Sequence, residues 1–411
     1  MDSIERRLTT DVTLAQAVVD LGEVARFAEL DGGRPVNLIR VGMAVDALSR
    51  YLIDAGAMLY GVVGRELLSE PALTSKERMV LGRWADDGLI EVTTGVADRA
   101  VEIADLTGLP LLAVGPYGEF AGRFPWLRDN PERVLRLAPR GGSAVLSPVD
   151  GAEVDPAVAR AVAVGKAPVT DGTAATGEVV PLDVFTTHGA QRISHTLVVR
   201  RRFIRAAPSE HGAALMTREW RCEDEMCSAF GEHRRPGQPL PRLRDGAPAC
   251  PRHGSPLRDV GPRPPSYAVS VVVDDLARRR FVVAADRPVS VGVASSEDHE
   301  VISVAEWASH EAAKAWIGPV HVRLEVRDGA LVVTDVSRTG TVIWRRSGPD
   351  DNGRTSWLRG SSTTLGDWDT VELYTGFELA RGDRRLATVV GRAEPLSVLL
   401  DAPTVAVPQL S

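Results

Sequence analysis

The chain has 411 residues, of which 44% are apolar and 25% are charged. This length exceeds what one hydrophobic core normally organises, so two or three domains are expected. A formal net charge of −7 argues against a protein whose whole surface coats nucleic acid. No apolar run approaches the roughly 20 residues that span a bilayer, so the sequence predicts a cytoplasmic protein without a membrane partner.

Strands and helices are predicted to alternate along the first third of the chain. A capping box is expected in one of the helices, with Thr74 or Ser75 ahead of Glu77. The alternation predicts a parallel α/β domain over residues 1–135, with functional groups at the carboxyl ends of its strands. The apolar runs place strands at 15–19, 57–63, 89–92 and 109–114 and helices at 36–55, 74–87 and 97–107.

Three motifs in this domain lie in a recognisable order. VVDLGEVAR contains Asp20 and Glu23, VADR contains Asp98, and FAGRFPW covers residues 120–126. Together they resemble PIN-like nuclease domains of the NYN group. The resemblance implies that Asp20 and Asp98 are catalytic carboxylates, which hold Mg²⁺ or Mn²⁺ for cleavage of RNA or single-stranded nucleic acid.

The third aspartate of that family has no counterpart in this sequence. Where it is expected, after the last strand, the chain reads VGP at residues 114–116. Glu23 replaces an asparagine of the family and either supplies a carboxylate or disturbs the site. Three alternatives stay open: a nuclease with an incomplete acidic site, an inactive PIN-like binding domain, or an ordinary domain in which Asp20 and Asp98 are turn and cap residues.

All three cysteines of the chain lie close together in sequence. Cys222 and Cys227 form a C-x4-C pair, and Cys250 and His253 form a C-x2-H pair. Two short pairs separated by a loop suit a tetrahedral zinc ion, and a closed set of four ligands indicates a structural role. The string CPRHGSPL resembles the second knuckle of zinc ribbons. The alternatives are His233 as the fourth ligand, or three unrelated free cysteines.

Arginines are frequent around the predicted zinc ribbon, which covers residues 220–260. If nucleic acid binds there, Arg221, Arg234 and Arg235 are expected to contact its phosphates. The arginines can equally reflect genomic base composition, because the chain uses almost no lysine. The preceding region, 136–219, is expected to be a β-rich connection without catalytic groups, beginning near the Gly-Gly pair at 141–142.

Short strands separated by turns fill residues 266–394. They predict an antiparallel β-sandwich, followed by a flexible tail at 395–411. The strands are expected at 268–273, 280–284, 289–293, 321–326, 331–335, 341–344 and 371–377.

The order of motifs in this sandwich resembles a forkhead-associated (FHA) domain. The core histidine is His321, VTDVSRTGT covers 333–341, and WDTVEL covers 368–373. FHA domains read phosphothreonine through an arginine, a serine and an asparagine, and the corresponding residues here are Val293, Gly318 and Thr339. The resemblance therefore implies a degenerate FHA-like domain that docks a protein without phosphothreonine, unless an arginine at 323 or 338 substitutes.

Two functions follow from these expectations. The first is a metal-dependent endoribonuclease or nucleic-acid-binding protein with a zinc ribbon and a docking domain. The second is a catalytically inactive adaptor in a multi-component system, which binds partner proteins through the FHA-like domain.

Overall fold

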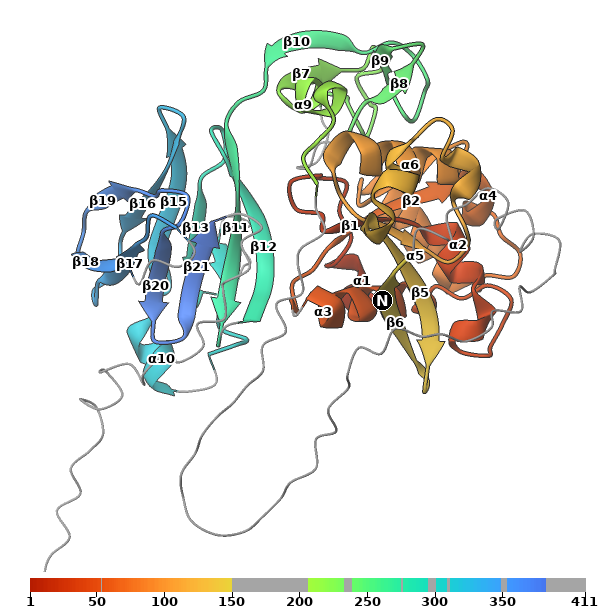
Figure 1. Cartoon of the computed structure of the whole chain (residues 1–411). Helices are drawn as coiled ribbons and strands as arrows, with labels where there is room; N and C mark the ends of the chain where they lie inside the picture. Colours follow the sequence, from red (N-terminus) through yellow and green to blue (C-terminus); the bar gives the residue numbers. More distant parts are fainter. Residues whose placement is uncertain are drawn as a thin grey trace, which may run out of the picture.

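The computed structural model describes residues 1–52, 54–149, 206–232, 239–274, 276–294, 301–308, 311–348 and 353–381. They form an α/β domain, a small module that carries the cysteines, and a β-sandwich (Figure 1). Residues 150–205 of the predicted β-rich connection and the tail predicted at 395–411 lie outside these residues. No helix in the described residues is long and apolar enough to cross a membrane.

The α/β domain is built on a six-stranded sheet with the order β3-β2-β1-β4-β5-β6. β3, β2, β1, β4 and β5 run parallel, and β6 runs antiparallel to β5. The predicted α/β domain is confirmed, and the prediction of a wholly parallel sheet is corrected at this edge. The strand bounds are β1 Ala17–Asp20, β2 Leu59–Gly64, β3 Ile90–Thr93, β4 Leu111–Ala113, β5 Val134–Arg140 and β6 Ser143–Pro148.

The last two strands extend the sheet past residue 135, which is the predicted end of the domain. Gly141 and Gly142 connect β5 to β6 with φ values of 55° and 75°. Two consecutive positive φ angles are what a tight hairpin turn requires, and glycine adopts them without strain. The Gly-Gly pair that was expected to open the connecting region is therefore a turn within the sheet.

Helices cover both faces of the sheet. Because strand side chains alternate, Ala17 and Val19 pack with α2, α3 and α5 on one face, while Val18 packs with α6 on the other. The predicted capping box is confirmed: Thr74 is the N-cap residue of α5, and Glu77 completes the box. The helix bounds are α1 Asp2–Glu5, α2 Leu21–Arg26, α3 Ile39–Leu52, α4 Arg65–Leu68, α5 Ser75–Asp86, α6 Val96–Thr107 and α7 Trp126–Asp129.

The cysteine module lies against the α6 side of the domain (Figure 1). It starts with α9, whose Gly212 passes so close to α6 that a Cβ atom there would lie 1.7 Å from the Leu106 carbonyl oxygen. Two antiparallel strand pairs follow, β7 with β10 and β8 with β9. The bounds are α9 Glu210–Met216, β7 Arg218–Arg221, β8 Arg242–Arg244, β9 Ala247–Ala249 and β10 Arg258–Pro262.

A buried arginine of α6 joins the module to the α/β domain. Arg99 has no exposed side-chain surface and forms ion pairs with Glu91, at 2.6 Å, and Glu102, at 2.8 Å. It also donates hydrogen bonds to the carbonyl oxygens of Leu240 and Pro241. Burial alone would lower the pKa of Arg99, but the two carboxylates outweigh this effect and raise it. The segment before β8 is thus held by a fully charged guanidinium.

The β-sandwich packs two sheets around one apolar core. The first has the order β12-β11-β21-β20-β17-β18 and the second β14-β13-β15-β16-β19. Within the described residues its strand pairs are antiparallel except β13 with β14. The predicted sandwich is confirmed, but the strand expected at 371–377 is divided between β20 and β21 by a turn with Gly376 at a φ of 80°.

The elements of the sandwich include several that the sequence did not predict: β14, β18, β19 and α10. Their bounds, with those of the other elements, are β11 Ser266–Val273, β12 Leu276–Ala284, β13 Val289–Gly292, β14 Val301–Ser303, α10 Glu311–Trp316, β15 Val322–Arg327, β16 Ala330–Asp335, β17 Thr341–Arg345, β18 Arg354–Leu358, β19 Ser362–Thr364, β20 Thr370–Tyr374 and β21 Phe377–Arg381.

Candidate functional site

The module brings the four predicted zinc ligands together. Cys222 follows β7 and Cys250 follows β9, and both pairs of ligands converge on one point. The Sγ atom of Cys222 lies 3.5 Å from Nδ1 of His253, Cys250 Sγ lies 3.7 Å from the same nitrogen, and the Cys227 and Cys250 sulfur atoms are 3.7 Å apart. All four potential ligand atoms lie within 4.8 Å of one another.

These distances fit a tetrahedral metal site. Zinc–sulfur bonds of about 2.3 Å and a zinc–nitrogen bond of about 2.0 Å place tetrahedral ligand atoms roughly 3.5–3.8 Å apart. The three cysteines are buried and their sulfur atoms are shielded from bulk water, whereas His253 is exposed. The residues present therefore fit a zinc ion held by three thiolates and one imidazole.

Short turns hold the ligands in this arrangement. Gly231 and Gly254 each stand four residues after a cysteine and donate a 2.7 Å hydrogen bond to its carbonyl oxygen. Gly254 has a φ of 71°, and a Cβ atom at Gly231 would lie 2.3 Å from the Glu225 carbonyl oxygen. On the far side of the imidazole, Nε2 of His253 lies 3.5 Å from a carboxylate oxygen of Asp224. A carboxylate behind a ligating histidine fixes the orientation of its ring.

One of the three thiols, that of Cys227, is close to the ionised form that binds metals, while its interaction with Cys250 raises the pKa of the Cys250 thiol. The hydrogen bond with Cys250 lowers the pKa of the Cys227 thiol to about 5, and backbone N–H groups at Phe230 and Ala229 add to this effect. The Phe230 amide donates to Cys227 Sγ over 3.4 Å. Because the thiolate is the metal ligand, this environment favours metal binding.

Of the three arginines predicted to contact phosphate, Arg221 alone lies among the described residues. Arg221 forms a 2.8 Å ion pair with Glu232, and both side chains are well exposed. Arg234 and Arg235 lie outside the described residues, as does the alternative ligand His233.

The predicted catalytic residues Asp20 and Glu23 lie where β1 and β4 end. Asp20 closes β1 and caps α2, accepting hydrogen bonds from the amides of Gly22, at 2.8 Å, and Glu23, at 3.0 Å. The Glu23 carboxylate reaches the loop after β4, where it accepts from the Gly115 amide at 3.0 Å and the Tyr117 hydroxyl at 2.9 Å. β1 and β4 are neighbours in the sheet, and the chain continues from β1 to β2 on one side and from β4 to β5 on the other. Open α/β sheets bind ligands at such a switch point.

Burial raises the pKa values of both of these carboxylates. Desolvation raises the pKa of Asp20, and two backbone amides oppose the rise. Desolvation also raises the pKa of Glu23, while the charge on Asp20 raises it further and the Tyr117 hydroxyl opposes. The two carboxylates therefore repel each other in a partly dehydrated site.

Asp98 is placed differently from Asp20 and Glu23. It lies in the first turn of α6, where Arg123 and Arg242 both bind its carboxylate, the latter at 3.2 Å. Among the described residues, three or more potential metal ligands converge only at the cysteine cluster. The structure does not join Asp98 to Asp20 and Glu23 as one ligand group.

Three loops meet at one end of the sandwich. Val293 donates a backbone hydrogen bond to Gly318 at 3.1 Å, and the Thr339 hydroxyl donates to the Trp316 carbonyl oxygen at 3.0 Å. The residues aligned with the phosphothreonine readers, Val293, Gly318 and Thr339, therefore lie at one place. His321 supports the loops from inside: it is fully buried, and its Nδ1 accepts from the Gly318 amide at 3.2 Å.

Two exposed apolar side chains lie next to these positions. Trp316 is 38% exposed at the end of α10, and Val336 is 48% exposed after β16. No sequence motif singles out Trp316, which is one of eight tryptophans in the chain. Its exposure follows only from the folded arrangement of the loops.

No protein-family model matches the chain, and no curated protein does. Among solved structures, the chain is similar to the FHA domain of the CT664 protein from Chlamydia trachomatis, with 16% identity over 29% of this chain and 98% of that one and a TM-score of 0.21. It is also similar to Rv1747 FHA-1 of Mycobacterium tuberculosis, with 22% identity over 29% of this chain and 97% of that one and a TM-score of 0.20. A third similar structure is the FHA domain of human APLF in complex with an XRCC1 bisphospho peptide, with 14% identity over 28% of this chain and 97% of that one and a TM-score of 0.20.

Proposed function

We propose that the chain is a catalytically inactive adaptor. Its FHA-like β-sandwich docks a protein partner at the three-loop end, and a structural zinc ion in the cysteine module holds the module's fold. The observation that carries the proposal is the composition of the loop end. The loops meet through a backbone hydrogen bond and the Thr339 hydroxyl, and they expose Trp316 and Val336 to solvent. The three positions aligned with the phosphothreonine readers, Val293, Gly318 and Thr339, carry no charge.

The chemistry of these side chains favours an unphosphorylated partner. A phosphate ester is recognised by charged or polar donors aimed at its oxygens. Val293 and Gly318 offer no side-chain donor, and the Thr339 hydroxyl already donates to the Trp316 carbonyl oxygen. An exposed tryptophan with a neighbouring aliphatic side chain is instead typical of the anchor of a protein interface.

Replacing Trp316 tests this docking surface. We expect Trp316→Ala to weaken binding of the partner about 30-fold, since truncating an anchoring tryptophan costs roughly 2 kcal/mol or more. A partner identified by affinity purification with the wild type would be purified and titrated against both proteins by calorimetry. Phosphatase treatment of the partner is expected to leave its affinity unchanged.

The matched control is Trp357→Ala. Trp357 is 59% exposed but lies on strand β18, outside the three loops. Equal losses in both variants would show that the loop end is not the docking surface. Loss of binding after phosphatase treatment would mean that Arg338 or Arg323 reads a phosphate.

A PIN-like nuclease is the second candidate function. The observation that favours it is the pair Asp20 and Glu23, two carboxylates with raised pKa values at the ends of β1 and β4. Mg²⁺ or Mn²⁺ would neutralise their mutual repulsion, and such ions accept few protein ligands. Against this candidate, the Glu23 carboxylate already accepts from Gly115 and Tyr117, and Asp98 is neutralised by two arginines.

Cleavage of labelled single-stranded RNA and DNA with Mn²⁺ separates the two functions. As an adaptor, the wild type is expected to show no cleavage above that of Asp20→Asn and Glu23→Gln. Cleavage by the wild type that both substitutions abolish would establish the nuclease instead.

A further inference from the structure

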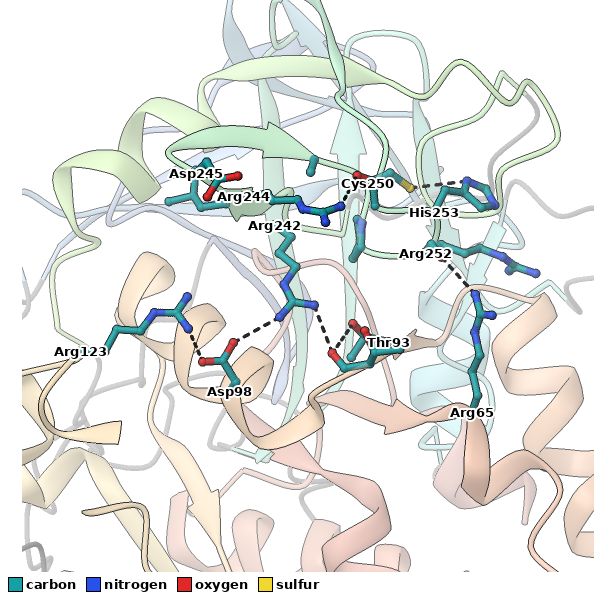
Figure 2. A pocket seen from close by; sticks show the side chains of 15 residues that line it. Arg65, Thr93, Asp98, Arg123, Arg242, Arg244, Asp245, Cys250, Arg252 and His253 are labelled. Atoms are coloured by element: carbon teal, nitrogen blue, oxygen red, sulfur yellow. Dashed lines mark hydrogen bonds and ion pairs between the residues drawn. The ribbon is translucent and has the colours of Figure 1, made fainter. Parts of the chain in front are cut away.

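An arginine-rich pocket lies between the α/β domain and the cysteine module. Its volume is about 590 Å³, and Figure 2 shows side chains from both parts facing it. Arg65 and Arg123 come from the α/β domain, and Arg242, Arg244 and Arg252 come from the module. Among the described residues, the carboxylates that line it are those of Asp98 and Asp245.

The charges in this pocket are not balanced. Asp98 is shared by Arg123 and Arg242, as Figure 2 shows. The other three arginines contact only neutral groups: Arg65 donates to the Arg252 carbonyl oxygen at 3.2 Å, Arg244 to the Gly254 carbonyl oxygen at 3.4 Å, and Arg252 to the Ser228 hydroxyl. Within the described residues, none of these three pairs with a carboxylate.

The position of the pocket in the fold also favours an anion. Arg65 follows the carboxyl end of β2, Thr93 is the last residue of β3 and Thr94 follows it. The pocket therefore opens at the sheet edge where α/β folds bind ligands. The 12-residue helix α6 starts at the same wall, and no side chain caps its N-terminus. The positive end of its dipole adds to the field of the arginines.

We propose that this pocket binds a small ligand with at least two adjacent phosphate groups, such as a nucleoside triphosphate. Guanidinium groups bind phosphate oxygens through charge-assisted hydrogen bonds, and three arginines without carboxylate partners match two or three phosphates. The volume lies in the range of small-molecule sites, about 300–1,000 Å³.

The side chains that line the pocket also indicate that it does not recognise the base of a nucleotide. Its apolar residues include Leu243, Ala249 and Pro251, and among the described residues no Phe, Tyr or Trp side chain lines it. Its imidazole, that of His253, belongs to the cysteine cluster. A base would therefore have no large aromatic ring to stack on, so the phosphates carry the affinity. ATP and GTP are expected to bind with affinities within about threefold of each other, and inorganic tripolyphosphate is expected to displace both.

Displacement of a fluorescent ATP analogue from the full chain tests the proposal. Arg244→Glu and Arg252→Glu are each expected to weaken binding at least tenfold, because a charge-assisted hydrogen bond is lost and a repulsive charge is added. Asp98→Asn is expected to tighten binding about threefold, since it releases Arg123 and removes one of the two carboxylates that Arg242 faces. The metal content of every variant is measured, so that loss of the cysteine module is recognised.

The matched control is Arg354→Glu. Arg354 is exposed on strand β18 of the sandwich, outside the pocket. The variant is expected to bind the analogue like the wild type. The proposal is overturned if the wild type binds none of the three phosphate compounds, or if the Arg244 and Arg252 variants with full metal content bind normally. Displacement by single-stranded oligonucleotides but not by tripolyphosphate would also overturn it and assign the pocket to a nucleic-acid strand.

Discussion

Cys250→Ser is expected to reduce the zinc content from about one ion per chain to nearly none and to unfold the cysteine module. Cys250 has no exposed surface and lies 3.7 Å from two other potential ligand atoms. The core of the module consists of five buried residues, and three of them are the cysteines themselves. Such a core cannot hold the module's two strand pairs together without the metal, because it buries too little apolar surface.

Elemental analysis and hydrogen exchange check this expectation. We expect fast exchange in β7, β9 and β10 of the variant and unchanged exchange in the α/β sheet. Ser255→Ala is the control, since its hydroxyl lies 3.8 Å from Cys222 Sγ but is not one of the four ligands. A wild-type chain that is folded and metal-free, with protected amides in the module, would contradict the zinc assignment.

Arg99→Met is expected to lower the free energy of unfolding by about 3–5 kcal/mol. The substitution keeps an apolar side chain of similar length but leaves the carboxylates of Glu91 and Glu102 buried without their partner. It also removes the hydrogen bonds to Leu240 and Pro241 that hold the segment before β8. Denaturant unfolding measures the loss, and limited proteolysis is expected to cut first near this segment.

Arg83→Met provides the comparison for Arg99. Arg83 also forms an ion pair, with Glu5, but its side chain is 49% exposed. Exposed ion pairs contribute about 1 kcal/mol or less to stability, so the free energy of unfolding of this variant is expected to stay close to that of the wild type. Adding Glu91→Gln and Glu102→Gln to Arg99→Met should recover part of the stability, because the unpaired charges are then gone. Equal losses in the Arg83 and Arg99 variants would argue against a buried charge network.

The incomplete acidic site illustrates the limit of motif reasoning. The sequence shows that the aspartate expected after the last strand is absent, but not what replaces it. In the structure the Glu23 carboxylate reaches Gly115 and Tyr117 in that loop, over 92 and 94 residues of sequence separation. Likewise, Asp98 is neutralised by arginines 25 and 144 residues away. No local pattern records contacts of this range.

The hairpin at the sheet edge shows a different limit. The Gly-Gly pair at 141–142 is compatible with a linker and with a tight turn, and both choices satisfy the same local propensities. Only the pairing of β5 with β4 and β6 decides between them. The prediction of a single strand at 371–377 was wrong for a related reason. The turn at Gly376 separates two strands that are both apolar, so the apolar pattern continues across it.

By itself, the sequence determined the features that depend on neighbouring residues: the alternation of strands and helices, the capping box at Thr74, the sandwich strands and the four residues that gather in the cysteine cluster. Periodicity, capping and ligand spacing act over a few residues, so they can be read along the chain. Tertiary structure alone decided which charges meet. It placed Arg65 beside Arg252, buried Arg99 between two carboxylates and exposed Trp316, because electrostatics and burial depend on distances through space.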